Sequence, residues 1–168
     1  HQIQHITWIV FASNAARKKE ALTSAALFLE GVESQDVQVL DYRDAFLSFS
    51  AMEIKEHFES IKSKLNPDIV FTHYRDDRHQ DHRLISDLTW NTFRNHMILE
   101  YEIPKYDGDL GIPQCFSQLS SAQVEKKIEM LLNAFESQKN KHWFDRETFL
   151  ALMRIRGLES AADSKYAE

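Results

Sequence analysis

Short apolar runs alternate along this chain with longer stretches of helical periodicity. Each run has the length and the β-branched content of a buried strand: 6–12, 37–40, 69–71 and 97–103. Each of the other stretches places apolar residues three or four positions apart, as an amphipathic helix does: 15–30, 51–65, 83–95, 120–138 and 146–157. The alternation predicts an α/β fold, a Rossmann-like, doubly wound and mostly parallel sheet flanked by helices.

Residues that favour helix ends stand at several expected boundaries. Asn14, Ser50 and either Ser120 or Ser121 can cap the helices that follow them. Gly31 can take the left-handed conformation that ends a helix, and Pro67 breaks the helix before the third strand.

Composition limits the class of protein. The 168 residues are 43% hydrophobic, which predicts one globular domain over 1–168 with a core. The net charge is −6 and Lys and Arg are interspersed with acids, so we expect no nucleic-acid partner. A single cysteine, no signal peptide and no apolar run of membrane-spanning length predict a cytoplasmic protein. The sequence leaves a homo-oligomer open.

Both ends of the sequence have the character of cut ends. The chain enters its first apolar run at Ile6 without an initiating methionine, and it stops at Glu168 where an extended segment begins. Four strands are few for a complete domain of this class. We therefore expect a truncated fold.

The densest polar stretch is the turn Asp76–His82, which holds two imidazoles and three carboxylates. It follows the third apolar run and precedes a helix. Ligands bind open α/β sheets at the carboxyl ends of strands, so this turn is the candidate site.

The residue types in the turn suit a metal-dependent amide hydrolase. One imidazole of the pair His79 and His82 can bind a divalent metal while the other faces the substrate. Asp81, between them, can orient an imidazole by accepting its second N–H. A protonated imidazole would stabilise the oxyanion or protonate the leaving amine. His73 and the remaining histidines have no such company, and we expect surface or packing roles for them.

The same residues resemble a known family. Thr72 and His73, followed by 77–83 with the sequence Asp-Arg-His-Gln-Asp-His-Arg, resemble the second conserved block of the PIG-L or LmbE-like de-N-acetylases. Further resemblances follow in family order: 17–21, 100–104, Lys127, 137–138, 156–157 and 166–168. Together they span nearly the whole chain.

The resemblance implies a zinc-dependent hydrolase that removes acetyl groups from N-acetylglucosamine derivatives, so the expected partner is a small N-acetylated sugar or glycolipid. It assigns His82 as a zinc ligand and His79 as the imidazole that stabilises the oxyanion or protonates the amine. It assigns Asp81 as an orienting partner and places Arg17 near polar groups of the substrate.

One departure from the family pattern is large. The family's first block, an Ala-His-Pro-Asp-Asp stretch that supplies the other ligands and the general base, is absent from this sequence. We expect the remaining ligands of Zn²⁺, or of another divalent metal, upstream of residue 1. One imidazole cannot hold a catalytic zinc, so we expect residues 1–168 alone to bind metal weakly and to be inactive.

Two other interpretations stay open. The order Asp77, His79, Asp81, His82 imitates a metallo-β-lactamase motif whose first histidine is replaced, although that fold is rich in strands and glycine and this chain has only four glycines. The second alternative is a non-catalytic α/β module that binds a carbohydrate or a protein partner. Metal content and acetate release separate these alternatives from the deacetylase.

Overall fold

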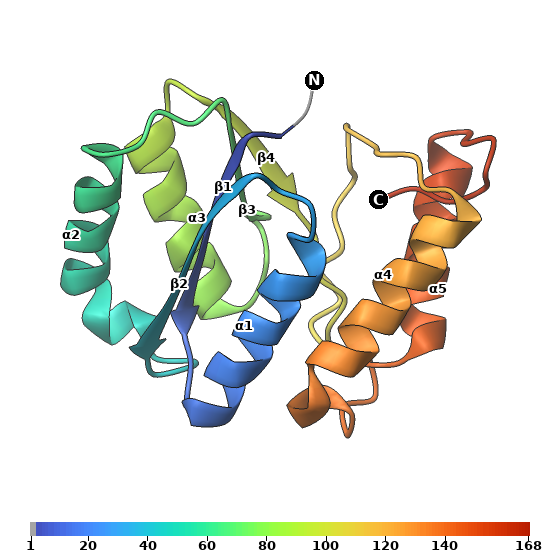
Figure 1. Ribbon diagram of the computed structural model, residues 1–168, viewed down its shortest axis with the longest axis horizontal. Coiled ribbons are helices and arrows are strands. Elements are labelled where there is room, and N and C mark those ends of the chain that lie inside the picture. The colour runs from blue at the N-terminus through green and yellow to red at the C-terminus, as the bar shows by residue number, and fades with distance from the viewer. Residues whose placement is uncertain (1–2) are drawn as a thin grey trace. The chain divides into compact units, whose positions relative to one another are not determined.

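The computed structural model describes residues 3–168 and has the α/β organisation that the sequence predicts (Figure 1). The chain divides into two compact units. The discontinuous unit comprises His1–Asp41 and Pro113–Glu168, and the central unit is Tyr42–Ile112. A single domain over 1–168 stays a prediction.

The discontinuous unit contains two paired strands and three α-helices. Its elements are β1 (His5–Ala12), α1 (Ala15–Phe28), β2 (Ser34–Tyr42), α4 (Ser121–Ala134), the 3₁₀ turn η2 (Glu136–Gln138) and α5 (Arg146–Glu159). The strands pair in parallel, because Ser34 N donates to Gln4 O at their starts and Ser13 Oγ donates to Leu40 O at their ends.

Helix α4 packs against both α1 and α5. The core between α4 and α5 is made of Leu119, Val124, Ile128 and Met153. Helix α1 is joined to η2 by a buried carboxylate, because Glu20 accepts hydrogen bonds from the backbone N–H and the hydroxyl of Ser137, both at 2.7 Å.

The carboxyl-terminal segment packs closely on α5 at Gly157. A Cβ built on Gly157 would lie 2.2 Å from the carbonyl oxygen of Lys165. Nearby, Ala167 N donates to Met153 O, and Leu119 N donates to Tyr166 O. Only a glycine permits this approach of the terminal segment to the helix.

The central unit contains the third and fourth strands with their helices: η1 (Leu47–Ser50), α2 (Ala51–Lys62), β3 (Ile69–His73), α3 (Gln80–Phe93) and β4 (Met97–Tyr101). Strands β3 and β4 are parallel, in a register that runs from Ile69 opposite Met97 to His73 opposite Tyr101. Thr72 reaches α3 from one face of this pair, since its hydroxyl donates to Thr89 Oγ1 at 3.1 Å. Parallel strands joined by a helical crossover confirm the predicted α/β class.

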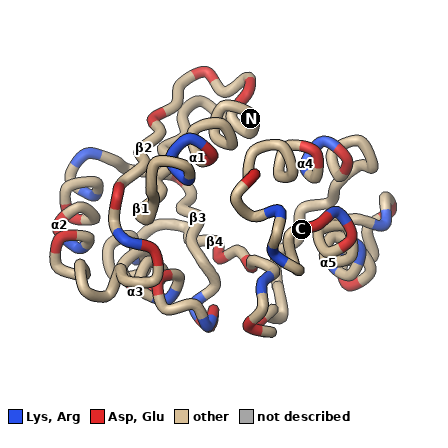
Figure 2. The backbone as a smooth tube through the Cα atoms, turned by 90° about the horizontal axis from the view of Figure 1, so that it is seen from below, with Lys and Arg blue, Asp and Glu red and all other residues tan. Residues whose placement is uncertain are grey.

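Charges of both signs are mixed along the helices (Figure 2). On α2, for example, Lys55 and Glu59 lie one turn apart and form an ion pair at 2.5 Å. Such exposed pairs contribute little to stability. No helix of residues 3–168 is long and apolar enough to cross a membrane.

Four of the five helices begin within one residue of the predicted start, and the helix ends differ from the predictions by two to four residues. Asn14 caps α1 and Ser120 caps α4, and Gly31 has a φ of +85°. Ser50, by contrast, makes no side-chain cap, because the 3₁₀ turn η1 leads directly into α2. Helix α3 begins at Gln80 rather than Arg83, and this earlier start places two of the candidate residues inside the helix.

Candidate active site

The predicted turn Asp76–His82 begins after the end of β3 at His73 and runs into the first residues of α3, which starts at Gln80. His79 is the N-cap of α3, and its Nδ1 accepts a hydrogen bond from the backbone N–H of Asp81 at 3.3 Å. Capping by an imidazole explains why the helix begins three residues before the apolar pattern does. His79, Asp81 and His82 are thereby brought together at the first turn of one helix.

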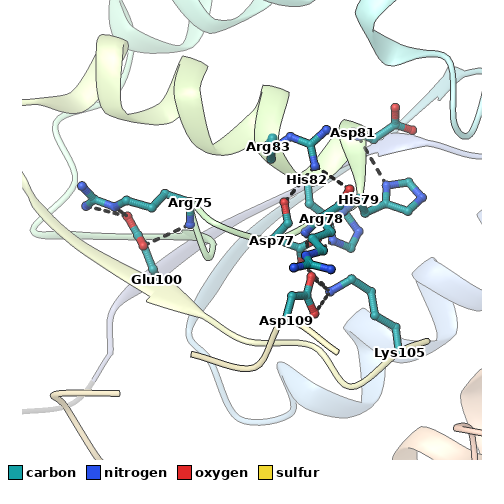
Figure 3. A network of polar contacts seen from close by, with 10 residues as sticks. All are labelled: Arg75, Asp77, Arg78, His79, Asp81, His82, Arg83, Glu100, Lys105 and Asp109. Carbon is teal, nitrogen blue, oxygen red and sulfur yellow. Dashed lines mark hydrogen bonds and ion pairs between the residues drawn. The ribbon is translucent and has the colours of Figure 1, made fainter. Parts of the chain in front are cut away.

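Asp77 is the hub of the polar network at this turn (Figure 3). Its Oδ1 accepts from the backbone N–H of His79 at 2.7 Å. Its Oδ2 accepts from His82 Nδ1 and from Lys105 Nζ, both at 2.9 Å. Only 3% of the Asp77 side chain is exposed, so a buried carboxylate holds one histidine by its backbone and the other by its ring.

Asp77 is ionised and His82 is neutral near neutral pH. Burial alone raises the pKa of Asp77, but the hydrogen bonds from His82, Lys105 and the His79 backbone outweigh it, so the pKa lies below its ordinary value. Burial, together with the charges of His79 and Lys105, lowers the pKa of His82 below its ordinary value, and the interaction with Asp77 offsets only part of this effect. A neutral His82 that donates from Nδ1 carries its lone pair on Nε2.

The ring of His79 has the opposite arrangement. Because its Nδ1 accepts from the Asp81 backbone, a neutral His79 carries its hydrogen on Nε2. The two ring centroids lie 4.6 Å apart. Adjacent imidazoles therefore present one hydrogen-bond donor and one electron pair.

A third histidine, His73 at the end of β3, belongs to the same cluster. Its ring stacks on His82 with centroids 4.0 Å apart and planes 2° from parallel, and Tyr101 packs edge-on against it. Burial, with the neighbouring His82, lowers the pKa of His73 to about 3, so this imidazole is neutral. The expectation that His73 lies apart from the other two histidines is therefore wrong, because His73 ends β3 directly before the turn into α3 and its ring contacts His82.

Lys105 and Asp109 reach the turn from the loop after β4. Lys105 Nζ donates to both oxygens of Asp109, at 2.7 and 2.6 Å, as well as to Asp77. Asp109 in turn accepts from the backbone N–H of Arg78 at 2.6 Å. Burial alone lowers the pKa of Lys105, but its bonds to Asp109 and Asp77 raise it overall, so the ammonium stays charged.

Asp81 has different contacts from those expected. Its carboxylate is buried and accepts from the backbone N–H groups of Ala45 at 2.7 Å and Leu47 at 3.1 Å. Figure 3 shows it directed away from the two imidazoles. The carboxylate that orients a ring is Asp77 instead, because the early start of α3 turns Asp81 toward the segment before η1.

A second charged group supports the strand ends. Glu100 on β4 accepts from Arg75 Nε at 2.8 Å and from Trp90 Nε1 at 2.6 Å, and the Arg75 guanidinium lies over the Trp90 ring at 4.5 Å. Burial alone raises the pKa of Glu100, and the hydrogen bonds from Arg75 and Trp90 lower it to below its ordinary value. Glu100 thus ties β4 to the segment after β3 and to α3.

Arg17 lies on α1, in the discontinuous unit, with its side chain half-buried and its backbone N–H bonded to Asn14. Its substrate-binding role stays a prediction.

The described residues do not by themselves fit a catalytic metal. Within residues 3–168, no group of three or more His, Cys, Asp or Glu side chains is arranged to hold an ion. The oxygens of Asp77 already accept from His79, His82 and Lys105. The ring of His82, whose Nδ1 donates to Asp77, carries a lone pair on Nε2 that could bind a metal.

Sequence reasoning did not assign roles to Asp77, His73, Lys105 and Asp109. Asp77 stands in the recognised turn, but its spacing does not reveal which carboxylate reaches a ring. Lys105 and Asp109 stand 28 and 32 residues further along the chain, and only the parallel pairing of β3 with β4 brings them near.

The sequence matches one known protein family. The family model described as PIG-L, GlcNAc-PI de-N-acetylase, matches residues 4–93, which is more than half of the chain. No curated protein matches the sequence significantly.

Two solved structures are similar in fold. The crystal structure of the conserved protein TT1542 from Thermus thermophilus superposes with a TM-score of 0.72 at 17% identity, covering 96% of this chain and 78% of that one. The deacetylase Dbv21, which acts on the A40926 pseudoaglycone, superposes with a TM-score of 0.55 at 16% identity, covering 99% and 83%. At these identities the likeness shows the fold alone.

Proposed function

Because the chain belongs to the PIG-L family, we propose that it is part of a metal-dependent hydrolase. Membership of this family supports a deacetylase-like function. The proposed reaction removes the acetyl group from an N-acetylated amino sugar, which is a free small molecule or part of a glycolipid. The observation that carries the proposal is the pair of complementary imidazoles at the start of α3. His79 presents a donor at Nε2 and His82 an electron pair at Nε2, with the rings 4.6 Å apart.

His79 has the role of the electrophilic or acidic group. Its Nε2–H can donate to the carbonyl oxygen of the acetamide as that oxygen gains negative charge, or transfer a proton to the leaving amine once the ring is protonated. The bond from the Asp81 backbone fixes the ring so that Nε2 is the atom that faces a substrate. Asp81 therefore contributes through its backbone N–H, while its carboxylate anchors the segment at Ala45 and Leu47.

His82 is proposed as one ligand of Zn²⁺ or of another divalent metal. Asp77 holds its ring by Nδ1, which is how carboxylates orient metal-binding imidazoles. The remaining ligands are proposed to come from residues upstream of residue 1, because those described do not complete a site. Arg17 is kept as a candidate contact for polar groups of the substrate, and a cytoplasmic location stays a prediction.

The two alternative functions have less support than the deacetylase. A metallo-β-lactamase-like hydrolase is disfavoured because the PIG-L model matches the sequence across the strands and helices up to α3. A non-catalytic carbohydrate-binding module is the second candidate for residues 1–168 alone, since no group of three or more His, Cys, Asp or Glu side chains within residues 3–168 is arranged to hold a metal ion.

The test uses a form of the protein extended upstream of His1, compared with residues 1–168. We expect the extended form to retain about one zinc per chain and to release acetate from an N-acetylglucosamine derivative. We expect the shorter form to do neither. Metal-free, folded, extended protein that binds the sugar without releasing acetate would establish the binding module instead.

A further inference from the structure

Two buried carboxylates from separate segments meet one buried ammonium beside the histidine turn. Lys105 Nζ lies 2.9 Å from Asp77 Oδ2 and 2.6 Å from Asp109 Oδ2. The exposed fractions of the three side chains are 9% for Lys105, 3% for Asp77 and 5% for Asp109. The group has a net charge of −1, and its members are shielded from water.

Each carboxylate also holds one of two consecutive backbone amides. Asp109 accepts from the N–H of Arg78 at 2.6 Å, and Asp77 accepts from the N–H of His79 at 2.7 Å. The carbonyl groups of Asp77 and Arg78 accept from the guanidinium of Arg83. The backbone that leads into α3 is therefore fixed by side chains, and Figure 3 shows them converging on it.

The arrangement depends on charge balance. Two carboxylates that share a site repel each other, and burial makes this repulsion expensive. Lys105 supplies the positive charge that allows both to stay ionised and close together. Without it, Asp77 and Asp109 would move apart or one would take up a proton, and a charge-assisted bond to Arg78 or His79 would weaken.

We propose that Lys105 is a positioning residue of the active site, whose ammonium holds Asp77 and Asp109 together and through them fixes the Arg78–His79 backbone and the ring of His82. Its three hydrogens point to these two carboxylates, so it acts through them rather than on the substrate. The inference rests on the proposed function only for its effect on turnover.

The test is a double-substitution cycle of Lys105→Met and Asp109→Asn. Lys105→Met removes the ammonium and leaves two facing carboxylates. Adding Asp109→Asn removes one negative charge, while the amide oxygen can still accept from Arg78. We expect the single Lys105→Met variant to weaken the bonds from the two carboxylates to the Arg78 and His79 amides. Because this defect is electrostatic, we expect the double variant to recover the bond to His79. Loss of lysine packing alone would not be rescued.

The readouts on residues 1–168 are the NMR positions and hydrogen-exchange rates of the Arg78 and His79 amides. Short bonds to carboxylates place amide protons downfield and protect them. We expect Lys105→Met to shift both amide protons upfield and to speed their exchange about tenfold or more. We expect Lys105→Met/Asp109→Asn to restore the chemical shift and the slow exchange of the His79 amide. Lys64→Met, at an exposed lysine of the same unit, is the matched control and should change neither.

In the extended form, we expect Lys105→Met to lower kcat about 10- to 100-fold with a smaller change in KM, as loss of an orienting partner does. If Lys105→Met does not fold, a folded double variant with a protected His79 amide supports the proposal. Unchanged amides in Lys105→Met would overturn it, as would a double variant no better than the single one. The amides are measured without substrate, so this test of Lys105 gives a result whether or not the protein is a deacetylase. Failure of the proposed function can therefore be distinguished from failure of this inference.

Discussion

The Nδ1 atom of His82 lies 2.9 Å from Oδ2 of Asp77, and the same carboxylate accepts the backbone N–H of His79 through Oδ1. One buried side chain thus holds His82 by its ring and His79 by its backbone. The ring of His79 is held separately, by the backbone N–H of Asp81, so the two rings have opposite hydrogen-bonding character.

Asp77→Asn should reduce turnover of the extended form about 10- to 100-fold, because the amide holds the His82 ring less firmly than a carboxylate does. Stability should fall by about 1–3 kcal/mol, since Lys105 and His82 lose a charged acceptor in a buried position. Steady-state kinetics and denaturant unfolding measure these effects.

The matched control for that substitution is Asp76→Asn, one residue earlier and exposed. It should leave both turnover and stability nearly unchanged. Equal effects of the two substitutions would mean that a general loss of negative charge, and not the bond to His82, is responsible.

Much of the fold followed from local signals. The apolar runs and the caps at Asn14 and Ser120 predicted strands and helices because these signals act within a few residues. Local signals did not predict the start of α3, since His79 is an uncommon cap and its imidazole accepts from the Asp81 backbone only in the folded turn.

The sequence predicted that His79, Asp81 and His82 lie together at one turn, but it did not predict which side chains they contact. His79, Asp81 and His82 were found because they are adjacent in sequence. Asp77, and not Asp81, contacts the His82 ring because α3 starts about one helical turn earlier than the sequence predicts. The position of Lys105 near the turn depends on the pairing of β3 with β4, which no local pattern specifies.

His79→Ala in the extended form should retain its zinc and lose turnover by the order of 10²–10⁴, because an acid or a donor to the oxyanion is removed. His82→Ala should instead lose the metal. Metal analysis beside acetate release distinguishes the two roles. Unaltered turnover in His79→Ala would remove that residue from the mechanism, and unaltered metal content in His82→Ala would remove it as a ligand.

Glu100 should make stability depend on pH in the acid range. Its pKa in the folded protein lies below the ordinary 4.5, so its stabilising contribution is complete above that value and is lost as pH falls through the lower, folded pKa. Denaturant unfolding of the wild type and of Glu100→Gln should therefore differ most above pH 4.5 and converge below it. Glu56→Gln, at an exposed position of α2, should follow the wild type, and a gap for Glu100→Gln that widens toward acid pH would contradict this sign.

Gly157→Ala should destabilise the discontinuous unit by about 3 kcal/mol or more, because the added Cβ meets the Lys165 backbone at 2.2 Å. In an ordinary helix the same change would stabilise by about 1 kcal/mol. Thermal unfolding measures the difference. Gly31→Ala, where a Cβ meets nothing but φ is +85°, should cost only about 1 kcal/mol, and equal effects at the two sites would exclude the close approach as the cause.

His79 and His82 present a donor and an electron pair side by side, and ¹⁵N NMR of the histidine rings at about pH 8, above the usual histidine pKa, measures this arrangement. The predicted spectrum shows His79 with its hydrogen on Nε2 and His82 with its hydrogen on Nδ1. The same tautomer in both rings, or rapid exchange between tautomers in His82, would contradict it.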